Sequence, residues 1–274
     1  MGETLIQYEP IIRLTASISI FALIALWELL SPRRELLFSR RLRWSNNIAL
    51  TFVNTITLRL LVPVAAVSAA YQASEHSWGL LNTLNLPPLL SIVIALLLLD
   101  LAIYLQHMIF HKVPVFWRLH RMHHTDMDFD LTSAARFHPL EMILSMFIKI
   151  AVVMLLGAPV IAVILFEVIL NATATFNHGN IRLPGKLDSV LRIFIVTPDM
   201  HRVHHSIYPE ETNSNYGFNL PWWDRLLGTY CAQPRDGHLD MTIGLNEFRS
   251  SREIWLDRLL RQPFIKNDVT QSKT

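Results

Sequence analysis

The sequence predicts an all-α integral membrane protein with about four transmembrane segments and a cytoplasmic-side helical cap that holds a histidine-rich dimetal site. Three observations predict this fold. Of the 274 residues, 51% are hydrophobic and only 17% are charged, whereas soluble domains usually carry about a quarter charged residues. Long apolar runs recur along the chain. Eight of the twelve histidines lie in three clusters that adjoin or follow these runs.

The first two apolar runs cover about residues 11–30 and 47–71. The second is less clean, and we expect its polar residues to face other helices. The connection between the runs carries five arginines, Arg33, Arg34, Arg40, Arg41 and Arg43. By the positive-inside rule it lies in the cytoplasm, which leaves the N-terminus outside. The connection 72–88 has no Lys or Arg and fits the opposite face of the membrane.

The third run, about residues 89–111, ends in a pair of histidines. Asp100, Tyr104, His107 and His111 follow at i, i+4, i+7 and i+11, which places them on one helical stripe. We expect Asp100 and Tyr104 to support the metal ligands by orienting an imidazole N–H. The alternative is a structural hydrogen bond to another helix.

The next apolar stretch, about residues 140–176, is too long for one span and is broken at Gly157-Ala158-Pro159. Two helices of about 17 residues are expected, either as a full down-and-up pair or as a re-entrant hairpin. After it we expect an amphipathic interfacial helix at 186–196 and a second ligand helix at 198–206. A loop with a short helix at 213–230 should then close over the site.

The histidine spacing predicts two metal ions. The pattern HxxHH occurs at His120–His124 and again at His201–His205, while His107 and His111 stand one helical turn apart. Positions i, i+3 and i+4 share a helix face, so each triplet can converge. Eight imidazoles are too many for one tetrahedral zinc and suit two neighbouring ions. The single cysteine, Cys231, excludes thiolate ligation in practice.

Four further histidines stand outside these clusters. His178 follows the broken apolar stretch and is a candidate ninth ligand. His138 precedes Pro139 at a helix start, where either ligation or a structural contact with Arg136 or Glu141 is possible. His76 and His238 are isolated, and we expect neither to bind metal.

The motifs HxxxH, HxxHH and HxxHH on a multi-span chain resemble the fatty acid hydroxylase and sterol desaturase superfamily. The resemblance runs from about Asp100 to Tyr230. Four flanking segments support it: Trp117–His120, Arg136–Glu141, Thr197–His201 and Ser214–Gly217. One departure is Met108, where many members have an arginine.

The resemblance implies a membrane-bound non-haem di-iron oxygenase. Such an enzyme uses two iron ions, O2 and external electrons to hydroxylate or desaturate a C–H bond of a lipid such as a sterol or fatty acyl chain. The implied metal ligands are His107, His111, His120, His123, His124, His178, His201, His204 and His205. The implied supporting residues are Asp100, Tyr104, His138 and Asp199. Residues 1–88 would then be N-terminal membrane helices, 89–232 the catalytic domain and 233–274 a cytoplasmic tail.

The expected partners follow from the same reading. The substrate is a lipid from the bilayer, and the active site lies on the cytoplasmic side of a bacterial inner membrane or the endoplasmic reticulum. No flavin or dinucleotide fingerprint occurs, so electrons are expected from a separate donor, a cytochrome b5-like protein or a ferredoxin with its reductase. The basic residues are dispersed, so no nucleic-acid partner is expected.

Other metal-binding functions fit the motifs less well. A membrane zinc hydrolase would usually show HExxH, yet Met108 follows His107 and Arg202 follows His201, and no general-base glutamate stands beside the clusters. A metal transporter or binding protein would place ligands near mid-membrane or in irregular loops. A bis-histidine haem protein needs histidines that face each other across separate spans, and adjacent histidines serve haem poorly.

Overall fold

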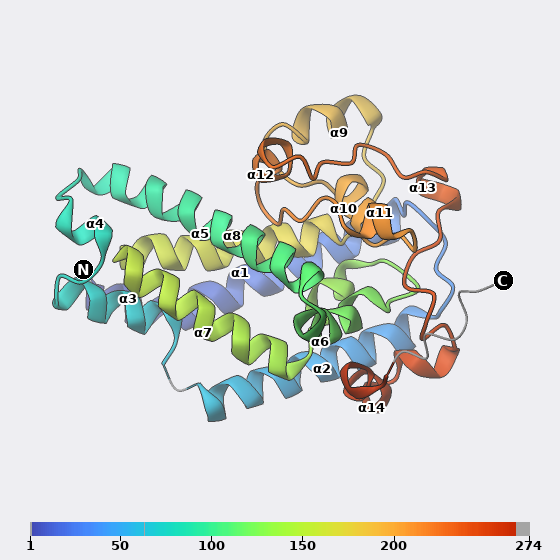
Figure 1. The fold of residues 1–274 in the computed structure, drawn as a ribbon, viewed down its shortest axis with the longest axis horizontal. Coiled ribbons are helices and arrows are strands. Elements are labelled where there is room, and N and C mark those ends of the chain that lie inside the picture. The colour runs from blue at the N-terminus through green and yellow to red at the C-terminus, as the bar shows by residue number, and fades with distance from the viewer. Residues whose placement is uncertain (1, 63, 267–274) are drawn as a thin grey trace.

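The computed structural model describes residues 2–62 and 64–266, and in these ranges the chain is helical, with two isolated β-bridges and no strand. Residues 267–274 of the predicted tail lie outside the described residues. Long helices form a bundle along the longest axis of the molecule (Figure 1). These helices are α1 (Gly2–Leu30), α2 (Arg40–Leu61), α5 (Pro88–Lys112), α7 (Pro139–Leu156) and α8 (Val160–Asn177).

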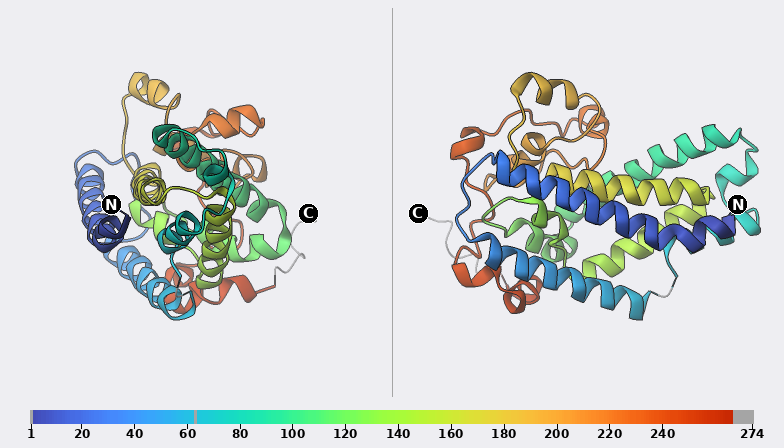
Figure 2. Two further views of the ribbon diagram at one scale, coloured as in Figure 1. Left: turned by 90° about the vertical axis from the view of Figure 1, so that its left-hand side faces the viewer. Right: turned by 180° about the vertical axis from the view of Figure 1, so that it is seen from behind.

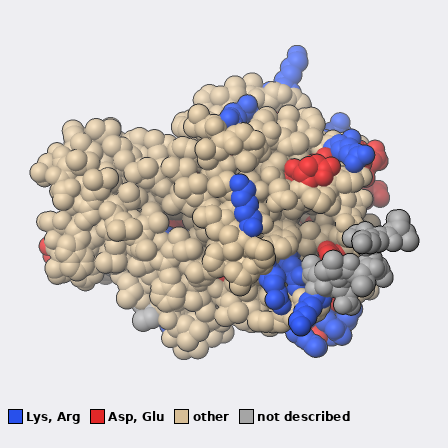
Figure 3. Space-filling model, viewed as in Figure 1, with Lys and Arg blue, Asp and Glu red and all other residues tan. Residues whose placement is uncertain are grey.

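The two ends of the bundle differ. The N-terminus lies at one end with α3 (Ala66–Glu75) and α4 (Leu80–Thr83) (Figure 2). The other end carries a cap of short helices, and on the face drawn in Figure 3 nearly all charged side chains gather over it. The cap consists of α6 (Pro114–His124), η1 (Leu131–Ala135), α9 (Gly185–Leu191), α10 (Pro198–His204), α11 (Pro209–Thr212), α12 (Trp222–Leu226), α13 (Gly237–Asp240), η2 (Ser251–Ile254), α14 (Leu256–Leu259) and η3 (Gln262–Phe264).

Five helical segments of the described chain are long and apolar enough to cross a membrane: Gln7–Leu30, Arg40–Thr83, Pro88–Lys112, Pro139–Leu156 and Val160–Asn177. Gln7–Leu30 and Pro88–Lys112 correspond to the predicted runs 11–30 and 89–111. Pro139–Leu156 and Val160–Asn177 correspond to the broken stretch 140–176. The second segment does not form one helix over 47–71, because α2 ends at Leu61. Val62 precedes a proline, which disfavours the helical region, and it adopts φ −127° and ψ 77°. The helix α3 then packs its alanines against α7 and α8.

The break between α7 and α8 falls at the predicted Gly157-Ala158-Pro159. Gly157 caps α7 in the left-handed conformation, with φ 63°. Gly79, at φ 92°, lies against it, and a Cβ on Gly79 would stand 2.1 Å from the Gly157 nitrogen. This contact lies at the end of the bundle away from the cap, and we call it the far-end turn. It requires glycine at both positions.

Buried charged residues join the cap to the bundle. Glu28, near the end of α1, accepts hydrogen bonds from the Leu131 nitrogen at 2.8 Å and the Asn180 nitrogen at 2.7 Å. Arg43 in α2 pairs with Asp126 and with Asp130, the latter at 3.0 Å. These contacts fix the segment after α6 and the segment after α8, which both carry histidines.

The cap differs in detail from its prediction. The expected interfacial helix at 186–196 ends at Leu191, and the second ligand helix spans Pro198–His204. Thr197 caps this helix with its hydroxyl, and Pro198 occupies its first turn. The 213–230 segment forms a loop with one short helix, α12, as expected.

Candidate metal centre

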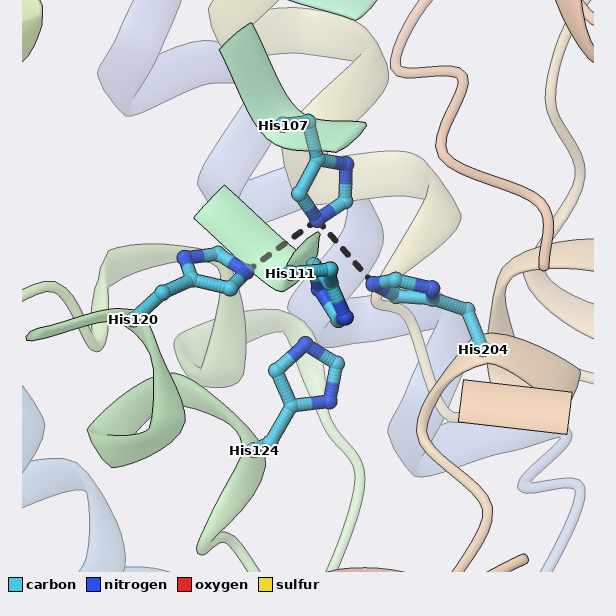
Figure 4. Close-up of side chains that lie close together, drawn as sticks. All are labelled: His107, His111, His120, His124 and His204. Carbon is cyan, nitrogen blue, oxygen red and sulfur yellow. Dashed lines mark hydrogen bonds between the residues drawn. The ribbon is translucent and has the colours of Figure 1, made fainter. Parts of the chain in front are cut away.

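Nine buried histidines meet where the cap joins the bundle, and they form two groups. The first group contains His107, His111, His120, His124 and His204, and the second contains His123, His178, His201 and His205. Within each group the candidate ligand atoms all lie within 4.8 Å of one another. No histidine of either group is more than 9% exposed. Figure 4 shows the first group, whose side chains point from α5, α6 and α10 toward one centre.

Helical spacing suggests that each HxxHH triplet converges on one site. In the structure each triplet is instead divided between the two groups. At about 100° per residue, His120 and His124 lie about 40° apart around the helix axis, whereas His123 lies about 100° from His124. Accordingly α6 gives His120 and His124 to the first group and His123 to the second. The helix α10 and the residue that ends it do the reverse, with His201 and His205 in the second group and His204 in the first. Each triplet therefore bridges both groups.

Facing ring nitrogens are spaced as ligands of a shared ion would be. In the first group, His107 Nε2 lies 3.1 Å from His120 Nε2 and 3.0 Å from His204 Nε2. In the second, His178 Nε2 lies 3.2 Å from His123 Nε2 and 3.1 Å from His201 Nε2. Nitrogens about 2.1 Å from one ion and at right angles would stand roughly 3.0 Å apart.

Several of these imidazoles lack any hydrogen-bond partner among the described residues. Both ring nitrogens of His111, His124 and His205 are buried without one. Buried polar atoms in proteins are normally satisfied, and a cluster of unsatisfied nitrogens is the donor set that a metal ion would complete. The residues present therefore fit two ions bound by imidazole.

Other imidazoles are oriented through Nδ1. His107 donates to the Tyr216 carbonyl and His204 to the Ser214 carbonyl, each at 2.7 Å. His178 donates to the Ala174 carbonyl at 2.8 Å. His120 stands apart because its Nδ1 lies 2.7 Å from a carboxylate oxygen of Glu141. In each case Nε2 remains available to bind an ion at the centre of the group.

Burial keeps these imidazoles neutral. It lowers the pKa of His120 to about 3, and it lowers that of His178 to about 4 despite the bond to the Ala174 carbonyl. For His123, His201 and His205, burial and then the neighbouring imidazoles hold the pKa well below its usual range. Neutral imidazole is the form that binds metal.

Asp100 and Tyr104 do not orient an imidazole, so that prediction was wrong. Asp100 accepts a hydrogen bond from Trp223 Nε1 at 2.8 Å, and the Tyr104 hydroxyl lies 2.7 Å from Thr229 Oγ1. Both residues anchor the 213–230 segment instead. Asp224 in this segment accepts from the Tyr216 nitrogen at 2.8 Å, which positions the carbonyl that holds His107.

His138 and Asp199 also lie outside both groups. His138 caps α7, where its Nδ1 accepts from the Leu140 nitrogen, and its Nε2 lies 3.3 Å from the Leu260 carbonyl. Asp199 pairs with Arg202 and, at 3.1 Å, with Arg33, so it ties α10 to the segment after α1. Neither bonds a histidine of the two groups. His76 and His238, expected to be uninvolved, are likewise in neither group.

Glu141 is the supporting residue that sequence reasoning missed. From the sequence it is expected only as a structural partner of His138, and no general-base glutamate is expected beside the clusters. The signal was present in the segment Arg136–Glu141, which places the carboxylate in the first turn of α7. Only the folded chain shows that this turn faces His120.

A cavity of about 360 Å³ reaches this centre from within the bundle. Its walls come from α1, α2, α5, α6, α7 and α8, with Ala134, Ala135, Phe137 and Phe218. His107 and His120, both of the first group, are the histidines that line it. The first group is therefore accessible from the membrane-embedded part of the molecule.

Comparisons with known proteins agree with this centre. The chain is 28% identical over 236 residues to ornithine lipid hydroxylase OlsE of Rhizobium tropici, a match covering 82% of this chain and 69% of that protein. It is 28% identical to alkylglycerol monooxygenase of Xenopus tropicalis, covering 54% of this chain and 32% of that protein. It is 26% identical to human cholesterol 25-hydroxylase, covering 50% of each. The match thus spans about a third to a half of the latter two proteins.

No solved structure matches the chain. The model of the family described as fatty acid hydroxylase matches residues 92–229, which is 138 of 274 residues and includes all nine histidines. The chain therefore belongs to the fatty acid hydroxylase family.

Proposed function

We propose that this protein is a membrane-bound di-iron oxygenase that hydroxylates a lipid with O2 and externally supplied electrons. The observation that carries the proposal is the pair of buried imidazole groups, one of which lines a cavity inside the membrane bundle. The relatives support lipid as the substrate class, because their names describe lipid hydroxylases and monooxygenases. Those names favour hydroxylation over desaturation.

The nine histidines would hold two iron ions, which supply the reduction of O2 and the oxidation of an unactivated C–H bond. The protein's own residues position the imidazoles and the substrate. Glu141, the Tyr216 carbonyl and the Ser214 carbonyl orient His120, His107 and His204 toward the first ion. The apolar cavity walls, which include Phe110, Phe137 and Phe218, exclude water and hold the substrate beside this ion.

We further propose that the cap faces the cytoplasm and receives electrons there. The charged surface over the cap and the arginines before and within the start of α2 support this orientation. A soluble or membrane-anchored donor, cytochrome b5-like or a ferredoxin with its reductase, would then dock on the cap. The membrane would be a bacterial inner membrane or the endoplasmic reticulum.

The proposal is tested by turnover. Iron-loaded protein in lipid nanodiscs is supplied with a reductase system, isotope-labelled O2 and separate pools of aminoacyl lipid, alkylglycerol and sterol. We expect one labelled oxygen atom in a lipid product, dependent on iron and reductant. Hydrolysis products that form without O2 or reductant would refute the proposal.

A further inference from the structure

The bundle cavity carries more hydrogen-bonding groups than an alkyl chain needs. Asn54, Gln106 and Ser145 contribute polar side chains to a wall whose surface area is mostly apolar. The amide oxygens of Asn54 and Gln106 are buried and have no hydrogen-bond partner among the described residues. Leaving such acceptors unpaired is unfavourable, so a ligand that donates to them is stabilised.

The orientation of the Asn54 amide is fixed by its partner. Its Nδ2 donates to the Phe137 carbonyl at 2.8 Å. A carbonyl oxygen only accepts, so the nitrogen must face it and Oδ1 is left as an acceptor. Asn54 is only 6% exposed, and it lies on the cavity wall. The cavity therefore offers a directed, buried acceptor.

Polar groups continue along the wall formed by α7. Glu141, Ser145 and Lys149 recur every four residues and share one helix face. Gln106 donates from α5 to Ser145 Oγ at 2.8 Å, halfway along this wall. At 1.5 Å per residue, the wall runs about 12 Å from the residue that holds His120 toward mid-membrane.

An ion network ends this polar wall. Lys149 donates to Glu167 Oε1 at 2.9 Å, and Arg13 Nη1 lies 2.8 Å from Glu167 Oε2. Charged residues inside a membrane are costly and commonly mark functional sites. The Glu167 carboxylate already has two cationic partners, so the acceptors still open to a ligand lie between this network and the histidines.

On the side of α1 and α2 the cavity wall reaches the outer surface of the bundle. Among its lining residues, Thr51 and Thr55 on α2 are exposed, and the Arg13 side chain on α1 is 42% exposed. Figure 2 (right) shows both helices on the face turned to the viewer. A lipid reaching the cavity from this side can leave its alkyl chains at the mouth.

We propose that the substrate lipid enters with its polar headgroup first, and that Asn54 and Gln106 select headgroups bearing O–H or N–H donors. The inference rests on the proposed function, because the reacting carbon must then lie beside His107 and His120. The oxidised carbon is accordingly in the headgroup or close to it, and the distal part of the alkyl chain is not the target.

The test measures lipid binding to iron-loaded protein, without turnover. Three probes share one chain length: an alkylglycerol with free hydroxyls, an aminoacyl lipid with an ammonium group, and the alkylglycerol dimethyl ether, which has no donor. The variants are Gln106→Met and Asn54→Leu. The matched control is Gln72→Met, on the exposed surface of α3 at the far end of the bundle. Iron content and thermal unfolding verify that each variant folds, and Gln106→Met leaves every backbone hydrogen bond in place.

Wild-type protein should bind at least one donor-bearing probe roughly tenfold more tightly than the ether, and Gln106→Met should largely remove this preference without weakening binding of the ether. Preference for the alkylglycerol identifies a hydroxyl headgroup, and preference for the aminoacyl lipid an ammonium headgroup. Equal binding of all probes to the wild type, or an unchanged preference in both cavity variants, would overturn the proposal.

The two proposals fail separately. Iron- and O2-dependent turnover without any headgroup preference refutes headgroup-first entry alone. A clear headgroup preference without iron-dependent turnover refutes the oxygenase.

Discussion

At the scale of single residues, the imidazoles of the two groups are held in two ways, by backbone carbonyls or by a carboxylate. His107, His178 and His204 donate Nδ1–H to backbone carbonyls, whereas His120 donates to the Glu141 carboxylate. A carboxylate partner makes the imidazole more basic and a stronger ligand. His120 also lines the cavity, so in the proposed enzyme the ion of the first group would be the one nearer the substrate.

Glu141→Ala should weaken iron binding roughly 10- to 100-fold, the range typical for lost partners of metal-binding histidines. Glu141→Gln keeps an acceptor for His120 Nδ1 and should recover much of this loss. Competitive chelation titrations of the purified variants measure the affinity. Equal affinities for wild type and Glu141→Ala would show that the carboxylate does not act through His120.

Removing one histidine from either group should abolish turnover. His204→Ala affects the first group and His123→Ala the second, and each should lose at least one of two irons while still inserting into the membrane. His76→Ala is the control, because His76 is exposed at the far end and stacks on Trp78. Full iron and activity in either cluster variant would contradict a shared centre.

The metal-free protein should lose stability as the pH falls from 6.5 toward 4. Burial lowers the pKa of His120 to about 3 and that of His178 to about 4, from 6.5. In that interval the unfolded chain binds protons that the folded chain does not, at a cost of about 1.4 kcal/mol per pH unit for each histidine. Thermal unfolding in detergent at pH 7 and pH 5 measures the change, and His178→Gln should show a smaller one. A midpoint that rises on acidification, or an equal drop in the variant, would contradict this assignment.

At the scale of elements, helix geometry explains how two sequence repeats make two mixed sites. In both triplets, on α6 and at the end of α10, the residues at i and i+4 enter one group and the residue at i+3 enters the other. Neither group is complete without both helices. The 213–230 segment adds the carbonyls that hold His107 and His204. Asp100 and Tyr104 anchor this segment through Trp223 and Thr229.

The far-end turn should depend on its paired glycines. Gly79→Ala requires a side chain at φ 92° that would meet the Gly157 backbone, so it should destabilise the protein by about 2 kcal/mol or more. Gly185→Ala is the matched control, because nothing lies within 4 Å of its added Cβ. Thermal unfolding in detergent compares the two. Similar midpoints would show that the turn adjusts at little cost.

At the scale of the whole molecule, the sequence predicted the helical bundle, the broken pair α7 and α8, and the meeting of all nine histidines. These features follow from hydropathy and from helical spacing, which are local. The division of each triplet between two groups, and the contact of Glu141 with His120, depend on how α6, α7 and α10 pack. Asp100 was misassigned for the same reason, because its stripe on α5 does not reveal that Trp223 reaches it.

The most direct test of the proposed di-iron centre is the metal content of detergent-purified protein, measured by elemental analysis and by Mössbauer spectroscopy after iron loading. We expect close to two irons per chain with the spectrum of a coupled pair, because two buried groups of imidazoles lie side by side. One zinc per chain with no capacity for iron would contradict it and would favour a membrane hydrolase.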